Sequence, residues 1–371
     1  MKSFLGFFKS GEISGIKDRV SKLEEAIERV LEKRADEFVS RAERKVVNQN
    51  PNSSRINVRF RGYETAILNI KNIGYNIGKA LYDARKDKPA RGPEVIELKS
   101  KLCTQDDIES DWVNFWCQEI RSAPIYHRKV WELCYIAQAI YNSGKLKPGM
   151  KGLVFGCGDE PLPSLFAKYG CSVVATDLSP AEASDKGWVD TNQHASGLDL
   201  IRKPGICPNT DDLNRISLEY VDMTDIPHRY HGEFDFCWSA CAFEHLGSIA
   251  KGLDFVENSL KCLKPGGIAV HTTEYNMIED GETIDNWPTV LFQKRHIVDF
   301  IARIRAGGYH VADLDLHPGD KILDGFVDLP PWSLLPTRMS HEGEGDVAHL
   351  KLSVDGFPCT SLGLIISKPV K

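Results

Sequence analysis

The sequence predicts an α/β fold: a Rossmann-like, seven-stranded sheet with helices on both faces, preceded by an N-terminal helical extension. From residue 150 onward, apolar runs of strand length alternate with helical segments, the order that builds a largely parallel sheet. A glycine turn, Gly156-Cys157-Gly158, follows the first of these runs, and Asp177 ends the second. With 371 residues, the chain is long enough for one large domain and an extension.

The first hundred residues precede this pattern. Apolar residues from Ile16 to Val30 alternate at spacings of four and three, which predicts a helix over residues 13–42 with about two heptads of coiled-coil seam. Two interpretations stay open: a short oligomerising helix, which would make a homo-oligomer, or a helix docked on its own domain. Residues 48–54 read as a linker, residues 64–85 as a second helix, residues 86–93 as a break and residues 94–142 as a helical, aromatic-rich segment. We therefore expect an N-terminal helix at 1–50, a linker and helical cap at 51–147, and the main domain at 148–371.

The main domain continues in the same alternation. Strands are expected at 218–222 and 234–239, a helix at 248–263, a Lys-Pro-Gly-Gly turn at 264–267 and a strand at 268–272. The last third predicts a helix at 294–306, a strand at 309–316, a loop through residue 336, and a hairpin formed by 349–354 and 360–367.

The glycine turn indicates a nucleoside ligand without a pyrophosphate. A dinucleotide turn needs a third glycine three residues after the second, but that position is Pro161, preceded by Asp159 and Glu160. Two carboxylates would repel a pyrophosphate, whereas they suit the sulfonium cation of S-adenosylmethionine (SAM). Asp177 lies nineteen residues after Gly158, where such folds place the carboxylate that binds a ribose.

Further cofactor residues follow from the strand ends. We expect Asp222 and Met223 to bracket the adenine, and Arg128 to hold the cofactor carboxylate, with Lys129 a second candidate. The complete predicted cofactor set is Gly156, Cys157, Gly158, Asp177, Leu178, Asp222, Met223, Ser239 and Arg128.

The motif order resembles that of the class I SAM-dependent methyltransferases. The glycine turn, the acid after the second strand and Leu-Lys-Pro-Gly-Gly before the fifth strand carry the resemblance, which covers about residue 150 to the C-terminus. The segments HRKVWE (127–132), SACAFEHLGS (239–248) and LKPGGIAVHTTEYN (263–276) are similar to one bacterial methyltransferase family associated with surface polysaccharide gene clusters. That resemblance implies a carbohydrate acceptor. One departure is Trp332 after two prolines, where the family pattern has a tyrosine.

Methyl transfer to a hydroxyl needs alignment and removal of the acceptor proton. We expect His245 to be the base, with Glu244 or Glu274 orienting it or binding a sugar hydroxyl, and His271 at the end of the fifth strand as the rival base. A metal-assisted route through His271, Glu274 and His349 is the alternative, but their spacing matches no metal motif, so no metal is predicted.

Charge and composition narrow the partners. Net charge is −6, but residues 1–101 carry +8 and the rest −14, and an acidic domain argues against a nucleic-acid substrate. Amino-methylating enzymes of nucleic acids commonly carry Asn/Asp-Pro-Pro-aromatic after the fourth strand, where this chain has Ser-Ala-Cys-Ala-Phe, so an oxygen acceptor is favoured. Ten cysteines without paired spacing and the lack of a membrane-length apolar run predict a cytoplasmic protein; peripheral membrane contact through residues 1–10 stays open. The alternative functions are methylation of another small metabolite or a protein side chain, or a non-catalytic interaction module.

Overall fold

The computed structural model describes residues 55–85, 89–180, 197–330, 332 and 348–370. The helix predicted at 13–42, its coiled-coil seam and the linker at 48–54 lie outside the described residues. The chain divides into two compact units, Met1–Asn69 and Ile70–Lys371. The predicted second helix is α2 (Arg55–Asp83), which begins nine residues earlier than expected and continues from the first unit into the second.

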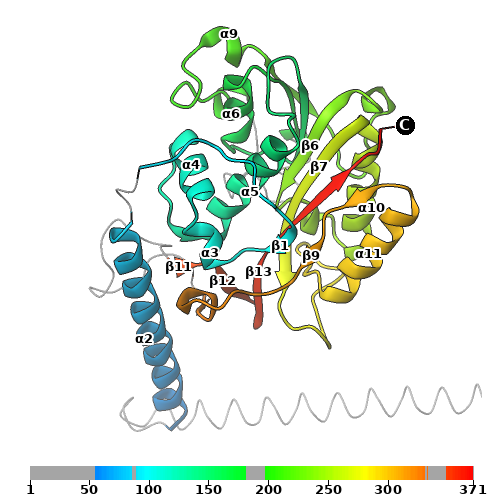
Figure 1. Ribbon diagram of the computed structural model, residues 1–371. Coiled ribbons are helices and arrows are strands. Elements are labelled where there is room, and N and C mark those ends of the chain that lie inside the picture. Colours follow the sequence, from blue (N-terminus) through cyan, green and yellow to red (C-terminus); the bar gives the residue numbers. More distant parts are fainter. Residues whose placement is uncertain (1–54, 86–88, 181–196, 331, 333–347, 371) are drawn as a thin grey trace, which may run out of the picture. The chain divides into compact units, whose positions relative to one another are not determined.

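A large mixed sheet forms the centre of the second unit (Figure 1). Its main path runs β10-β12-β13-β7-β6-β3-β4-β5. Five neighbouring strands of this path are all parallel: β3 (Lys151–Phe155), β4 (Ser172–Asp177), β5 (Ile216–Tyr220), β6 (Phe234–Ala240) and β7 (Leu263–Asn276). After β5 the chain returns to the other side of β3 to form β6, so the strand order reverses between β3 and β6. Open sheets of this kind bind ligands beyond the carboxyl ends of the strands at that point.

The two faces of the sheet carry two hydrophobic cores, because parallel strands covered on both sides are apolar throughout. Phe236 and Trp238 of β6 pack on the face covered by α4 (Asp111–Glu119), α5 (Arg128–Asn142) and α6 (Leu162–Lys168). Cys237, between them, packs on the opposite face with α10 (Ile249–Ser259) and α11 (Lys294–Ala306). Figure 1 shows these helix groups on either side of the sheet. The predicted Rossmann-like α/β fold is confirmed.

The C-terminal hairpin predicted from the sequence is present. β12 (Lys351–Val354) and β13 (Phe357–Ser367) pair antiparallel, and β13 also pairs antiparallel with β7 along nine residue pairs. The short strands β1, β8, β9 and β10 extend this side, giving an eleven-stranded sheet over the described residues.

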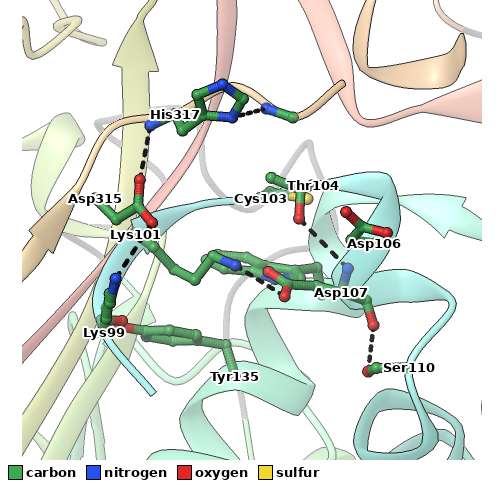
Figure 2. A network of polar contacts seen from close by, with 12 residues as sticks. Lys99, Lys101, Cys103, Thr104, Asp106, Asp107, Ser110, Tyr135, Asp315 and His317 are labelled. Atoms are coloured by element: carbon green, nitrogen blue, oxygen red, sulfur yellow. Dashed lines mark hydrogen bonds and ion pairs between the residues drawn. The ribbon is translucent and has the colours of Figure 1, made fainter. Parts of the chain in front are cut away.

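Residues 94–142 differ from the expected continuous helical segment. β1 (Ser100–Leu102) adds to the sheet by pairing with β13 and β9 (Leu314–Asp315), and it is followed by α3 (Gln105–Ile108), α4, β2 (Tyr126–His127) and α5. Polar contacts fix this segment (Figure 2): Lys101 Nζ lies 2.9 Å from Asp107 Oδ1, and the Tyr135 hydroxyl donates to the Lys99 carbonyl at 2.7 Å. Sheet pairing with distant strands overrides local helix propensity here.

The remaining elements are short. They are α8 (Leu198–Ile201), α9 (Thr210–Leu213), β8 (His310–Val311), β10 (Val327–Asp328), β11 (Ala348–His349) and the 3-10 turns η1 (His228–Tyr230), η2 (Phe243–His245), η3 (Leu260–Cys262) and η4 (Ile322–Asp324). β11 pairs with β2 in a separate two-stranded sheet. Within the described residues, no helix combines the length and apolar character that a membrane span requires.

Candidate active site

A cavity of about 590 Å³ lies at the carboxyl ends of β3, β4 and β6, where the strand order reverses. The turn after β3 and the segment after β6 form two of its walls, and α5 contributes a third. Its charged lining is mostly acidic, with two lysines. The charged lining residues are Lys129, Glu132, Asp159, Glu160, Asp177, Lys203 and Asp222.

The glycine turn brings main chain close to the segment after β6. Gly156 and Gly158 have φ of 59° and 55°, a left-handed conformation that other residues adopt at a cost. A Cβ on Gly156 would lie 2.8 Å from the Ala242 Cβ, so only glycine fits without a shift. Cys157, between the two glycines, lines the cavity, and burial raises the pKa of its thiol well above the ordinary value.

Asp177 is held in place at the end of β4. Its Oδ2 accepts a hydrogen bond from the Gly158 N–H at 2.9 Å, and its Oδ1 accepts from the Leu178 N–H at 2.8 Å. These two bonds orient the carboxylate, and a carboxylate held in this way suits a vicinal diol such as a ribose. Asp177 and Leu178 both line the cavity.

Asp222 and Met223 lie just beyond β5 and line the same cavity. Asp222 Oδ1 accepts from the Thr224 N–H and from the Thr224 hydroxyl, both at 2.7 Å. These bonds fix the carboxylate beside the largely buried Met223 side chain. A polar acceptor next to an apolar surface suits the edge and face of a purine.

Two predicted cofactor residues do not line the cavity. Ser239 is fully buried, and its hydroxyl contacts His271 Nδ1 at 2.8 Å. Arg128 is part of a buried ion network, paired with Glu132 at 3.0 Å and in contact with Glu274. The expectation that Arg128 holds the cofactor carboxylate is therefore wrong in this arrangement, because its guanidinium balances two buried glutamates. Lys129 lines the cavity instead.

His245 lines the cavity near the segment after β6. Its Nδ1 lies 3.0 Å from the Thr289 Oγ1, which orients the ring. Glu244, expected with Glu274 as the alternative to orient this ring or bind a sugar hydroxyl, is fully buried, and its Oε2 accepts from the Thr273 hydroxyl at 3.0 Å. Burial raises the pKa of Glu244 above its ordinary value.

His271 is not at a strand end, because β7 continues to Asn276. Its side chain is fully buried in mid-strand, with Nδ1 2.8 Å from Ser239 Oγ and Nε2 3.1 Å from Ser259 Oγ. Burial lowers the pKa of His271 to about 3. Both ring nitrogens are occupied by serines, so the structure corrects its placement as a base at the pocket.

Glu274 contacts Arg128 and does not line the cavity. His349 is bonded to Asp328, at 2.7 Å from Nδ1 to Oδ2, so the three residues of the metal-assisted alternative have separate partners. Among the described residues, no group of three or more His, Cys, Asp or Glu side chains could hold a metal ion.

Glu132 is a cavity residue that sequence reasoning did not single out, and Glu160, expected from the sequence to suit a sulfonium, also lines the cavity. Glu160 Oε1 accepts from the Trp238 indole N–H at 2.6 Å, and burial raises the pKa of Glu160 to about 8. Burial alone would raise the pKa of Glu132, but Lys129 and Arg128 outweigh it and hold that pKa below its ordinary value. Glu132 ends the HRKVWE segment. The signal that could have identified it is helical spacing, which places Lys129, Glu132 and Leu133 on one face of α5, the face that lines the cavity.

Residues 131–303, a little under half of the chain, match the family model described as a methyltransferase domain. No curated protein matches the chain. The chain therefore contains a methyltransferase domain over these residues.

Solved structures give distant likenesses. A putative sarcosine dimethylglycine methyltransferase from Galdieria sulphuraria is 21% identical over 52% of this chain and 54% of that chain, with a TM-score of 0.28. The Haemonchus contortus phosphoethanolamine N-methyltransferase 2, in complex with SAM, is 18% identical over 48% and 37%, with a TM-score of 0.33. A SAM-dependent methyltransferase from Methanosarcina mazei is 12% identical over 62% and 96%, with a TM-score of 0.36. The chain thus spans about half or less of the first two proteins, and likenesses this distant do not bear on its substrate.

Proposed function

We propose that this protein is a SAM-dependent methyltransferase that methylates a hydroxyl oxygen of a carbohydrate, a surface glycan or its precursor. The observation that carries the cofactor part is the acidic cavity at the strand-order reversal, with five carboxylates and two lysines in its lining. Such a lining opposes a pyrophosphate and suits a cofactor with a cationic sulfonium. The carbohydrate part rests on the resemblance of the motif segments and on His245, a base suited to a hydroxyl acceptor.

The cavity residues fit the cofactor group by group. Asp177, fixed by two main-chain N–H groups, would accept hydrogen bonds from the ribose hydroxyls. Asp222 and Met223 would contact the adenine, and Lys129 would take the carboxylate role first assigned to Arg128. Glu132 would face the positive charges of the methionine portion. Glu160, whose pKa is raised to about 8 by burial, would join it where a nearby cation favours the ionised form of its carboxyl group. When bound, SAM supplies an activated methyl group and a neutral thioether leaving group.

The chain's own task is to align the acceptor and remove its proton. His245 is the histidine among the cavity-lining residues, and the Thr289 hydroxyl holds its ring. We assign it as the base that accepts the hydroxyl proton as the oxygen attacks the methyl carbon, since imidazole has a proton affinity near working pH. Glu244 and Glu274, being buried behind the cavity wall, would act on the site only through His245 and Arg128.

Two alternative functions can be distinguished from this one by experiment. Methylation of another small metabolite or a protein side chain would use the same cofactor residues with a different acceptor. A non-catalytic interaction module would have no need of a pre-oriented Asp177 beside an open glycine turn. The segment after β6, residues 239–243, lacks the Asn/Asp-Pro-Pro-aromatic sequence of nucleic-acid amino methylation.

The test is incubation of the full chain with radiolabelled SAM and polysaccharide extracts, followed by isolation of the labelled product and linkage analysis. Label in an O-methyl sugar supports the proposal. Label in protein or in a small metabolite would replace the acceptor class. SAM binding by calorimetry without transfer to any extract would favour the non-catalytic module. His245→Ala is the matched control variant, because it keeps the cofactor residues and should bind SAM but transfer little label.

A further inference from the structure

Two histidines far apart in the sequence form a stacked pair outside the catalytic assignments above. β2 and β11 pair in parallel, with His127 directly opposite His349. The two imidazole rings stack with centroids 4.8 Å apart and an interplanar angle of 29°. Neither ring has a role in the cofactor site as described.

The hydrogen bonds of the pair fix different tautomers in the two rings. His127 Nδ1 accepts from the Lys129 N–H at 3.0 Å, so in the neutral ring the proton is on Nε2. Burial, with help from His349 and Arg128, lowers the pKa of His127 well below its ordinary value, which keeps that ring neutral. His349 Nδ1 lies 2.7 Å from Asp328 Oδ2, and a carboxylate only accepts, so neutral His349 has its proton on Nδ1 and a bare Nε2.

Asp328 is paired with a buried lysine. Lys71 Nζ, fully buried, lies 2.5 Å from Asp328 Oδ1 and 2.7 Å from the Leu329 carbonyl oxygen. The Tyr75 hydroxyl donates to Asp328 Oδ2 at 3.0 Å. A carboxylate fixed in this way sets the tautomer and the orientation of the His349 ring.

The pair is at the same edge of the sheet as the cavity. Strand registers place Asp328 opposite Leu352, Leu352 opposite Cys359, and Cys359 opposite Asn276, the last residue of β7. On the other side, the N–H that His127 accepts belongs to Lys129, which lines the cavity.

The outer nitrogens of the pair make no hydrogen bond within the described part of the chain. The His127 side chain is partly exposed, and the His349 side chain is 7% exposed. Trp332, 38% exposed, stands edge-on to His349 with ring centroids 6.4 Å apart. A donor, an acceptor and an exposed aromatic face together match a ligand that carries hydroxyls and an apolar ring face.

We propose that His127, His349 and Trp332 form an acceptor subsite that binds adjacent hydroxyl groups of a saccharide ring. The His127 Nε2–H donates to one oxygen, the His349 Nε2 accepts from the neighbouring hydroxyl, and the Trp332 indole packs on the sugar ring. This inference rests on the proposed function, since it places the glycan next to the methyl-transfer cavity.

An anchoring role for the network accounts for part of these contacts but not for all. Lys71, Tyr75 and Asp328 would tie α2 to β10 with or without a ligand. Anchoring requires neither opposite tautomers on two stacked rings nor an exposed tryptophan beside them. The two roles differ in one measurable respect: only the subsite responds to a sugar.

The experiment uses the full chain, labelled with ¹³C in the histidine ring and saturated with S-adenosylhomocysteine. The ring Hε1 resonances of His127 and His349 are assigned with His127→Gln and His349→Gln. The probes are the methyl glycosides of glucose, galactose, mannose and rhamnose. Glycerol supplies adjacent hydroxyls without a sugar ring, and tetrahydropyran supplies the ring without hydroxyls.

At least one glycoside is expected to shift both resonances saturably while the exposed His228 stays unchanged. Trp332→Ala, a substitution at an exposed position, should weaken that response about threefold to tenfold. No shift with any glycoside, or equal shifts with glycerol or tetrahydropyran, overturns the subsite. Calorimetry on the same sample separates the two proposals: absence of S-adenosylhomocysteine binding counts against the methyltransferase function, whereas intact binding with silent histidines counts against the subsite alone.

Discussion

Replacing His271 tests whether this histidine is structural. Its ring is fully buried between the hydroxyls of Ser239 and Ser259, and burial lowers its pKa from 6.5 to about 3. The folded protein therefore holds His271 neutral, while the unfolded chain protonates it once the pH falls below 6.5. Between pH 6.5 and 3 the unfolded state binds one more proton than the folded state, so stability is lost as the pH falls through this window.

The size of the effect follows from the same two pKa values. pH 5 lies 1.5 units below 6.5, the pKa of His271 in the unfolded chain. That difference corresponds to a loss of about 2 kcal/mol in the free energy of unfolding. His271→Gln keeps a polar side chain between the serines but has no proton to gain. Relative to the variant, the wild type should lose about 2 kcal/mol more on going from pH 7 to pH 5.

The assay is urea unfolding, followed by circular dichroism, at pH 7 and pH 5 for both proteins. His310→Gln, at an exposed position on β8, is the matched control. Equal pH dependence in wild type and His271→Gln would refute the buried-neutral account. A loss of turnover at pH 7 in His271→Gln, with folding and SAM affinity intact, would return the base role to His271.

Three further predictions concern the cavity. Asp177→Asn should weaken SAM binding about tenfold to a hundredfold, because one charged acceptor is lost; calorimetry measures the affinity, and Asp254→Asn, at an exposed position of α10, should leave it unchanged. His245→Ala should cut turnover by about a hundredfold to ten-thousandfold at unchanged SAM affinity; full turnover in the variant would dismiss the base assignment. For Glu160, the folded pKa of about 8 lies above the unfolded 4.5, so the folded state keeps a proton that the unfolded state releases, and stability should fall as the pH rises from 4.5 to 8. That fall is at most about 1.4 kcal/mol per pH unit; Glu160→Gln should abolish it in urea unfolding, and a variant that keeps the wild-type slope would show that Glu160 is not its source.

The parts of the site that depend on local sequence could be predicted. The sharp turn from β3 into α6 needs residues that adopt positive φ, and Gly156 and Gly158 supply them. The length of the next strand, β4, then sets where its final acid lies. Asp177 meets the Gly158 N–H for this reason. Local spacing was sufficient because both residues belong to one β-turn-α-β unit.

The parts of the site that depend on contacts between distant segments could not be predicted from the sequence. Arg128 and Lys129 are neighbours in the sequence, and only packing against Glu274, on β7, decides which of them is buried in an ion network. His271 was expected at a strand end because the strand was expected to stop at residue 272, whereas pairing with β13 carries β7 on to Asn276. The stacked pair of His127 and His349 forms only because β2 and β11 pair, and no local sequence pattern predicts that pairing.

The position of β13 has a consequence for biosynthesis. This strand lies between β7 and β12 and also pairs with β1 and β8, so residues 357–367 hold together segments made early and late in translation. Until those residues leave the ribosome, the adjoining edges of β7 and β1 have no partner, and exposed strand edges invite aggregation. Nascent chains stalled before residue 357 should therefore depend on chaperones, and a premature stop there should yield insoluble protein rather than a smaller folded domain.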